Sequence, residues 1–401
     1  MRVLHVLPFC QVPPNFGGAF RVFFMLKSIA RYHQVTVLSF GDESVENRLR
    51  EAFDSRLSDV CVVPRPDERT KTKRLTQFFS LWQNRSFTMS HFGFEEMQKH
   101  IDRILSNQEF DIVQVELSLM GQFRFNTDAI KILDEHNVEY DTLRRMGLAT
   151  RSVVRKLYYY TQYRKLYHEE IRVCEKQDAI LVTSVRDKQV LDQDVPHVPK
   201  FVIPNGVDSS YFTSTSEIPE RWSLVFTAAM NYFPNSDGII RFLDDIFPHI
   251  QKAVPSVRLY VVGSGPPAGL LKRRSDNVIV TGYVEDVRPY VRRASVYVVP
   301  LWMGGGTRLK VLEAMAMRKP IVTTTIGCEG IDVEDGITAL VRDDPEEFAE
   351  AVIELLRDDT KRAKLAENGY ANVQNKYDWS IIGERLADAY RSIVTGHKQE
   401  K

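Results

Sequence analysis

Short β-branched runs that alternate with amphipathic stretches, in two successive series, constrain the fold of this chain more than any other feature. Apolar runs bounded by turn residues are typical of strands buried on both faces, and their alternation with helical patterns predicts a parallel sheet with helices on both sides. The expected strands of the first series are 3–7, 34–40, 60–63, 111–115, 130–133, 179–183 and 201–203, and those of the second are 224–228, 258–262, 278–281, 296–301 and 320–324. The fold class predicted is therefore α/β, with two Rossmann-like, doubly wound domains.

The break between the two series lies at Pro204-Asn205-Gly206 and the polar run that follows it. A chain of 401 residues is longer than one hydrophobic core usually covers, so two domains are expected. We expect an N-terminal domain over 1–203, a hinge over 204–220, a C-terminal domain over 221–376 and a final helix over 377–401. Ligands of open α/β sheets bind beyond the carboxyl ends of the strands, so the cleft between two such domains is the expected site.

Charge and cysteine content exclude several classes of protein. Lys+Arg and Asp+Glu both number 53, so no overall basic field favours a nucleic-acid partner. The four cysteines are far apart in the sequence, which is typical of a reducing cytosol and not of a disulfide scaffold or a zinc site. No run approaches the roughly 18 apolar residues of a membrane span. We expect a cytoplasmic protein whose anion-binding groups are local.

The glycine run Gly304, Gly305 and Gly306 directly follows the expected strand 296–301. Glycines let the backbone approach a ligand closely, and a helix that begins near Thr307, a plausible N-cap residue, would present its amide groups to an anion. This arrangement predicts an anion site at the start of the helix.

Two cations lie where they oppose the dipole of that helix, at Arg308 and Lys310. An anion such as a diphosphate would compensate them. They are about 200° apart on an ideal helix, so they converge on one anion only if Arg308 still belongs to the loop. Glu313, one turn further on, could accept hydrogen bonds from ribose or sugar hydroxyls. The alternative is a solvated Lys310/Glu313 pair with no ligand.

The segment 304–322, GGGTRLKVLEAMAMRKPIV, closely resembles the donor site of group 1 (family-4-like) glycosyltransferases of GT-B fold, in the branch with a GGGTRLKVLEAMA motif that is often linked to polysaccharide assembly. Other segments match in order and spacing. IPNGVD at 203–208 resembles the interdomain hinge of the family, VVGSGP at 261–266 its second C-terminal strand and turn, and TGYVEDV at 281–287 the turn that packs on the nucleobase. Tyr377-Asp378-Trp379 resembles the start of a last helix that returns to the N-terminal domain.

The resemblance implies roles for individual residues. The catalytic residues would be His136, Arg308 and Lys310, with His136, in the loop DEHNVE at 134–139, contacting the donor sugar. The donor would be bound by Gly17, Gly18, Tyr283, Val284, Gly304, Gly305, Gly306, Thr307, Arg308, Lys310 and Glu313. Glu116 and Asn137 are candidate acceptor contacts. From the residues alone, His136 could equally be a capped loop histidine, and His5 is expected to be a core residue.

Two departures from the family pattern affect the site. Gly305 stands where many members have the first of two glutamates, and the region 228–238 has no cation where the family often has an Arg and a Lys. Neutralisation of a departing diphosphate would then depend on Arg308 and Lys310.

The implied activity is that of a retaining glycosyltransferase. It would move a sugar from a nucleoside-diphosphate sugar to a hydroxyl of a glycan, a polysaccharide precursor or a lipid-linked sugar. No Asp-x-Asp motif follows a strand, so we expect no metal, and no other cofactor. Alternatives are a sugar-nucleotide epimerase or a phosphorylase of the same fold and, from another class, a non-catalytic nucleotide-sugar-binding subunit.

Two stretches, 65–82 and 151–167, combine cations with aromatic residues. Such a combination could contact an anionic membrane that carries a lipid-linked acceptor, at the inner face of the cell membrane. The ordinary alternative is a helix whose tyrosines pack on the core and whose cations extend to solvent.

Overall fold

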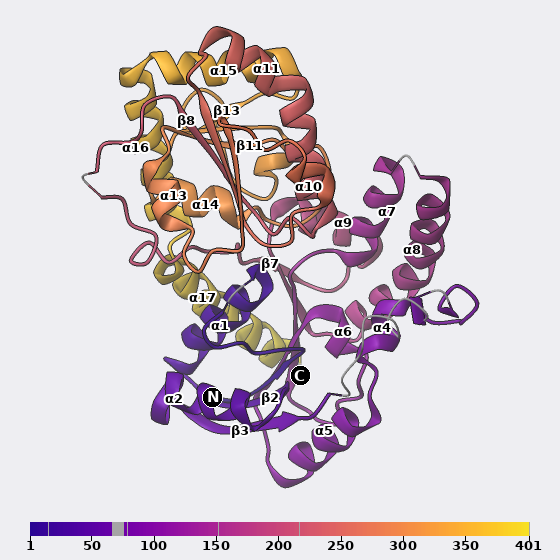
Figure 1. The fold of residues 1–401 in the computed structure, drawn as a ribbon. Helices are drawn as coiled ribbons and strands as arrows, with labels where there is room; N and C mark the ends of the chain where they lie inside the picture. Colours follow the sequence, from indigo (N-terminus) through magenta and orange to yellow (C-terminus); the bar gives the residue numbers. More distant parts are fainter. Residues whose placement is uncertain (15, 66–75, 78, 151, 216, 401) are drawn as a thin grey trace. The chain divides into compact units, whose positions relative to one another are not determined.

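A computed structural model describes residues 1–400 apart from residues 15, 66–75, 78, 151 and 216. The chain divides into two compact units (Figure 1). Unit 1 contains Met1–Pro204 and the chain from Gly383 onward, and unit 2 contains Asn205–Ile382. Each unit is built on one parallel sheet, which confirms the predicted α/β fold class with two doubly wound domains. No helix in the described part of the chain is long and apolar enough to cross a membrane.

The sheet of unit 1 has the strand order β3-β2-β1-β4-β5-β6-β7, and every neighbouring pair is parallel. Its central strands are buried on both faces, as their β-branched sequences predicted. The strands are β1 (Arg2–Leu7), β2 (Gln34–Phe40), β3 (Leu57–Val63), β4 (Ile112–Glu116), β5 (Ile130–Glu135), β6 (Ala179–Val182) and β7 (Lys200–Val202). The helices are α1 (Gly17–Ala30), α2 (Glu43–Phe53), α4 (Phe87–Phe92), α5 (Glu95–Asn107), α6 (Leu117–Gly121), α7 (Glu139–Ala149), α8 (Val153–Cys174), α9 (Val185–Asp194) and most of α17 (Trp379–Glu400).

The sheet of unit 2 has the order β10-β9-β8-β11-β12-β13 and is also parallel throughout. Its strands are β8 (Ser223–Thr227), β9 (Arg258–Val262), β10 (Val278–Gly282), β11 (Val296–Val299), β12 (Ile321–Thr323) and β13 (Leu340–Val341). The helices are α10 (Phe233–Arg241), α11 (Phe247–Ala253), α12 (Ala268–Leu271), α13 (Arg288–Arg293), α14 (Leu309–Ala316), α15 (Pro345–Arg357) and α16 (Asp359–Lys376). The helices pack on the sheet through a continuous apolar core.

The segment from Phe233 to Ala253 is not one continuous α-helix. The chain forms α10, then a π-helical segment over Phe242–Ile246, and then α11. Pro248 lies in the first turn of α11 and has no amide to donate to a carbonyl one turn back, so the hydrogen-bond register changes before it. Pro234 lies in the first turn of α10, a position that suits proline.

Glycines fix how closely the segments after β8, β9 and β11 approach one another. Gly263, directly after β9, has φ +143°, and a Cβ atom there would lie 1.7 Å from the carbonyl oxygen of Ala228. Gly238 of α10 is packed so tightly that a Cβ atom would lie 2.3 Å from the carbonyl oxygen of Pro300, just after β11. The chain segments at the carboxyl edge of this sheet therefore touch through their backbones.

We predict that Gly263→Ala destabilises unit 2 by more than about 3 kcal/mol, because backbone must move to admit the new methyl group. Gly282→Ala is a matched control, since Gly282 has φ +77° but nothing within 4 Å of its Cβ position. Conformational strain alone should cost the control about 1 kcal/mol. Urea unfolding followed by tryptophan fluorescence would measure both losses, because Trp222, Trp302 and Trp379 all belong to unit 2. Equal losses would contradict the steric argument.

Candidate functional site

The glycine loop after β11 is shaped by left-handed backbone conformations. Gly304 has φ +118° and Gly306 has φ +76°, values that favour glycine. The loop holds the guanidinium of Arg308, whose Nη1 donates to the carbonyl oxygen of Gly305 at 2.7 Å and whose Nε donates to that of Ile326 at 3.1 Å. A Cβ atom on Gly304 would lie only 3.0 Å from the guanidinium. The glycines therefore allow a buried cation to fold over the loop.

Arg308 is the N-cap residue of α14, with φ −86° and ψ 78°. It belongs to the loop, which meets the condition under which Arg308 and Lys310 can converge. The prediction that Thr307 caps the helix is wrong, because α14 begins at Leu309. The backbone of Gly330 lies against Thr307 instead, and the buried Thr307 hydroxyl has no hydrogen-bond partner in the described part of the chain.

Lys310 extends from the first turn of α14 to the start of α10. Its Nζ donates to Oδ1 of Asn235 at 3.0 Å and lies 4.6 Å from the ring centre of Phe226. Lys310 and Glu313, both among the described residues, form no ion pair, so the solvated pair considered as the alternative is not what the fold produces. Asn235 is itself held by a bond from Nδ2 to the carbonyl oxygen of Ala229 at 2.9 Å.

Asn235 is a site residue that the sequence reasoning missed. The signal was present, since Asn235 lies in the region 228–238 where the family often has cations. An amide there gives Lys310 a neutral partner, so the positive charge of the ammonium is not cancelled.

Burial dominates the electrostatics of this cluster. Burial, reinforced by the nearby Arg308 cation, lowers the pKa of Lys310 to about 7. Burial also raises the pKa of Glu313 to about 7, against the opposing effect of Lys310. Groups poised near neutrality in a partly desolvated place are a mark of functional sites. A bound anion would restore the full charge of Lys310.

The other predicted donor residues of unit 2 lie beyond β10. Tyr283 follows Gly282 and is 77% exposed, so its ring is open to solvent, and Val284 beside it is partly buried. Because the strands are parallel, the ends of β10 and β11 lie at the same edge of the sheet, with β9 and β8 between them. The sheet thus places Tyr283 and the glycine loop along one edge.

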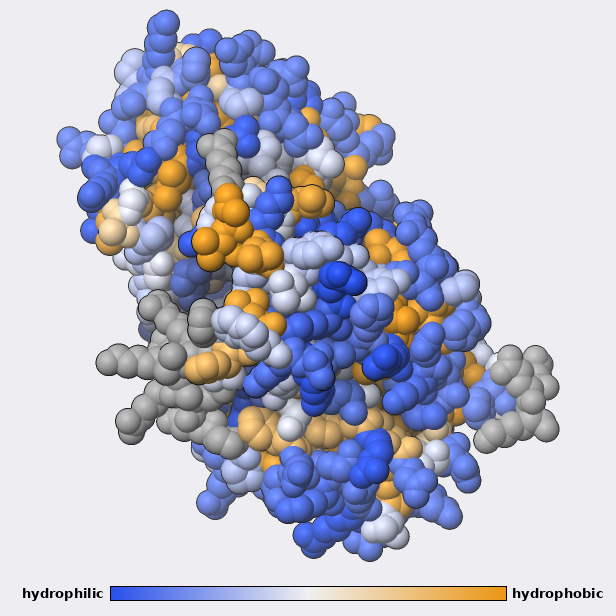
Figure 2. Space-filling view, turned by 90° about the vertical axis from the view of Figure 1, so that its right-hand side faces the viewer, coloured by the Kyte–Doolittle hydropathy of each residue, from blue (hydrophilic) through white to orange (hydrophobic). Residues whose placement is uncertain are grey.

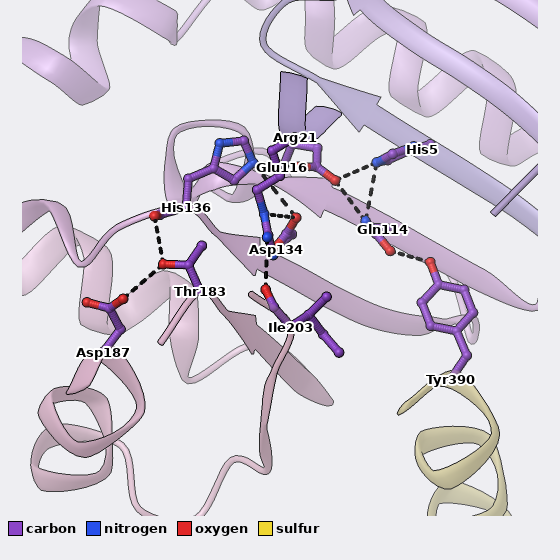
Figure 3. A network of polar contacts seen from close by, with 10 residues as sticks. All are labelled: His5, Arg21, Gln114, Glu116, Asp134, His136, Thr183, Asp187, Ile203 and Tyr390. Carbon is purple, nitrogen blue, oxygen red and sulfur yellow. Dashed lines mark hydrogen bonds and ion pairs between the residues drawn. The ribbon is translucent and has the colours of Figure 1, made fainter. Parts of the chain in front are cut away.

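A second group of predicted residues lies in unit 1 around the carboxylate of Glu116, at the end of β4 (Figure 3). One oxygen, Oε1, is 2.6 Å from Nε2 of His5 and 2.7 Å from Nε2 of Gln114, and the other, Oε2, is 2.7 Å from Nε2 of His136. Although burial alone would raise it, the bonds from His136 and His5 hold the pKa of Glu116 well below its usual range. The carboxylate is therefore ionised, and it fixes His136 with Nε2 as a donor.

The network continues to the C-terminal helix. The hydroxyl of Tyr390, on α17, donates to Oε1 of Gln114, and both side chains are buried. Glu116 is completely buried by its own partners, so in this arrangement it positions His136 and has no exposed atom for an acceptor. His5 is buried in β1, as expected, but as part of this polar network.

Asp134 and Arg21 close the other side of the network. Nε of Arg21 donates to one oxygen of Asp134 at 2.9 Å and Nη2 donates to the other, while Nη1 donates to the carbonyl oxygen of Ile203 at 2.9 Å. Ligand atoms of Glu116, Asp134 and His136 lie within 4.8 Å of one another, a spacing that could hold a metal ion. Their oxygens already accept hydrogen bonds, and the Arg21 cation occupies Asp134, so the donor set fits a closed hydrogen-bond network better than a metal.

The Nδ1 side of the His136 ring lies next to the start of α1. A Cβ atom on Gly18 would lie 3.7 Å from Nδ1 of His136, and α1 begins at Gly17 without a side-chain cap. Asn137 is turned toward Glu139, with Nδ2 3.4 Å from Oε1. The structure therefore brings Gly17, Gly18 and His136 together in unit 1, as the resemblance implies, while their roles stay predictions.

Solved structures with the same fold span nearly the whole chain. Sucrose-phosphate synthase from Thermosynechococcus elongatus matches with a TM-score of 0.69 at 18% identity, covering 99% of this chain and 100% of that one. Anabaena Alr3699/HepE, solved in complex with UDP, matches with a TM-score of 0.67 at 12% identity, covering 98% and 100%. The architecture is the GT-B fold, with its two parallel-sheet α/β domains.

Residues 221–358 match the family model described as glycosyl transferases group 1, so this part of the chain is a group 1 glycosyltransferase domain. An uncharacterized 44.6 kDa protein in the cps region of Klebsiella pneumoniae is 20% identical over 94% of this chain and 96% of its own length. A GDP-mannose-dependent phosphatidylinositol monomannoside mannosyltransferase of Corynebacterium glutamicum is 30% identical over 47% of this chain and 55% of its own. The chain thus spans about half the length of that mannosyltransferase, and the predicted enzyme class, a glycosyltransferase, is confirmed.

We predict that Glu116→Gln releases the tautomer of His136. The amide leaves buried donors without an acceptor, which should cost about 1–3 kcal/mol of stability. The imidazole should also populate the form with its proton on Nδ1, which loss of stability alone would not cause. Nitrogen chemical shifts of the His136 ring would measure this. Glu139→Gln is the matched control, because Glu139 is nearby but does not bond to His136. An unchanged tautomer in Glu116→Gln would contradict the positioning role.

We also predict that affinity for a nucleoside-diphosphate sugar falls as pH rises through about 7. Lys310, with a pKa of about 7, is charged below that pH and neutral above it, and a diphosphate favours the charged form. Glu313, also near 7, becomes negative over the same range and acts in the same direction. The loss should approach about tenfold per pH unit. Calorimetry from about pH 6 to pH 9 would measure it, and Lys310→Arg should weaken the dependence, because arginine keeps its charge. A flat profile for the parent would contradict the assignment.

Proposed function

We propose that the protein is a retaining, metal-independent glycosyltransferase that uses a nucleoside-diphosphate sugar as donor. The acceptor is a hydroxyl of a glycan, a polysaccharide precursor or a lipid-linked sugar, and the reaction is cytoplasmic. One observation carries the proposal: in a group 1 glycosyltransferase domain, Arg308 folds over the glycine loop by donating to the carbonyl oxygens of Gly305 and Ile326, and the buried ammonium of Lys310 donates to the amide oxygen of Asn235. A diphosphate is an anion that two such neighbouring cations can bind.

The diphosphate is the part of the donor that the cations bind, and it is also the leaving group of the reaction. In glycosyl transfer the bond between the anomeric carbon and a diphosphate oxygen breaks, a bond to the acceptor oxygen forms, and the proton of the acceptor hydroxyl passes to the departing diphosphate. The departing oxygens gain negative charge while the sugar becomes oxocarbenium-like. Arg308, Lys310 and the amides at the start of α14 can stabilise that charge without a metal.

The remaining parts of the donor, namely the nucleobase, the ribose and the transferred sugar, are each assigned to other predicted residues. Tyr283 and Val284 are proposed to pack on the nucleobase, Glu313 to accept from ribose or sugar hydroxyls, and Gly304 to Thr307 to approach the phosphates through the backbone. In unit 1, His136 is the proposed contact of the transferred sugar, and the ionised Glu116 supports it by keeping Nε2 protonated. Names of relatives agree with this class of donor, since one solved structure of HepE contains UDP and the Corynebacterium enzyme is GDP-mannose-dependent.

We predict that Lys310→Met weakens binding of the preferred nucleoside diphosphate by about 10- to 100-fold, because a charge-assisted phosphate contact is lost while an apolar side chain of similar length is kept. A thermal-shift screen of nucleoside diphosphates identifies the base first, since a ligand of the native state raises the melting temperature. Lys364→Met, an exposed lysine of unit 2, is the matched control.

Turnover separates the alternatives. Product analysis with the donor and a set of hydroxyl acceptors should give a glycoside whose anomeric configuration matches that of the donor, and activity should survive a chelator. An epimerised donor with no glycoside would support an epimerase, and an unchanged donor would support a binding subunit. If Lys310→Met binds and turns over like the parent, the diphosphate assignment is wrong.

A further inference from the structure

The hairpin tip, where α7 ends and α8 begins, exposes a group of large apolar side chains. Figure 2 shows this side of the molecule, on which several apolar patches (orange) lie among hydrophilic side chains (blue). Val153 and Val154 are 81% and 80% exposed, and Leu148, Leu157 and Tyr160 are 69%, 66% and 55% exposed. Scattered exposed apolar residues are normal, whereas a contiguous group marks an interaction surface.

Helix α8 has one buried face and, on the opposite side of its first turns, a second face with exposed apolar side chains. An ordinary surface helix has an apolar face only where it packs on the core. One face carries the buried residues Gln162, Leu166, Glu170 and Val173 and packs on unit 1. Val153, Leu157 and Tyr160 recur at intervals of four and three residues, so they lie together on a different face, which points to solvent.

The backbone fixes the tip against the rest of the hairpin. Gly147 of α7 packs against Tyr159 of α8, where a Cβ atom would lie 3.3 Å from the Cβ of the tyrosine. Further along α8, the rings of Tyr163 and Tyr167 pack with Tyr140 of α7. The expectation that the tyrosines pack on the core therefore holds for Tyr163 and Tyr167, whereas Tyr160 is 55% exposed.

The charged residues of this segment are all basic. Residues 142–168 contain seven cations and no Asp or Glu, in a chain whose formal net charge is zero, and one of the seven, Arg144, pairs with Asp141 just before the segment. The seven are Arg144, Arg145, Arg151, Arg155, Lys156, Arg164 and Lys165. Arg155 and Lys156 are exposed within the first turn of α8, directly beside Val153 and Val154. The other basic and aromatic stretch, 65–82, lies largely outside the described residues and has no part here.

We propose that the hairpin tip docks on the surface of a lipid bilayer with anionic headgroups. The aliphatic side chains enter the interface between headgroups and acyl chains, and the cations around them bind the headgroups. A bilayer uses both features at once. A second copy of the tip would bring two sets of cations together, and a nucleic acid would leave the valines and leucines exposed to water. This docking does not depend on the proposed donor site.

Flotation with lipid vesicles tests the proposal on the full chain. The parent should bind vesicles of phosphatidylcholine with added phosphatidylglycerol, bind vesicles of phosphatidylcholine alone far less, and lose binding as salt is raised, since salt screens the attraction. The double variant Val153→Ser/Val154→Ser and the double variant Arg155→Gln/Lys156→Gln should each reduce binding by at least about tenfold.

Control variants alter other exposed residues of the chain. Val185→Ser, at the start of α9, and Lys364→Gln, in unit 2, should bind vesicles like the parent. Melting temperatures and nucleoside-diphosphate binding should be unchanged in every variant, so a loss of vesicle binding would not reflect misfolding or a damaged donor site.

Three outcomes would overturn the proposal. The first is equal binding of both vesicle types by the parent, and the second is vesicle binding by the two double variants at the parent's level. The third is a parent that ignores vesicles but forms a dimer, or binds nucleic acid, in a way that the double variants abolish.

Discussion

Parallel pairing of the strands is the constraint on which both sites depend. Because every neighbouring pair in each sheet is parallel, all carboxyl ends within a unit lie at one edge. In unit 2, the segments that follow β8, β11 and β12 are therefore close together. Arg308, after β11, bonds to the carbonyl oxygen of Ile326, after β12, and Lys310 bonds to Asn235, after β8. In unit 1 the same rule places Glu116 beside Asp134, its partner in the β4–β5 register.

The two sites handle buried charge in opposite ways. Around Glu116 the charges are closed within the protein, since the carboxylate is held by histidines and Asp134 by Arg21. At the glycine loop, Arg308 and Lys310 are bonded to uncharged oxygens, and the pKa values of Lys310 and Glu313 both move toward 7. The first arrangement pairs its charges within the protein, whereas the neutral partners of the second are the basis of the proposed diphosphate site.

The fold was largely predictable because its signal is local. Buried strands are continuous β-branched runs, and each expected strand has a counterpart within a few residues. The errors lie where a tertiary contact overrides a local pattern. Thr307 is a good N-cap residue by type. In the fold, however, Thr307 lies against Gly330, Arg308 is bonded to carbonyl oxygens of Gly305 and Ile326, and α14 begins at Leu309. The register change before Pro248 was likewise invisible in the apolar periodicity.

The sequence by itself determined the two-sheet architecture, the triple-glycine loop and the enzyme class, since these depend on residue order along short segments and on a region that the family model also matches. Only the tertiary structure decided that Arg308 belongs to the loop, that Lys310 reaches Asn235, that Glu116 is buried between two histidines, and that Val153 and Leu157 face solvent. Those facts concern residues far apart in the chain or the burial of a single helix face, and both are set by packing, which acts across distances that a local pattern does not encode.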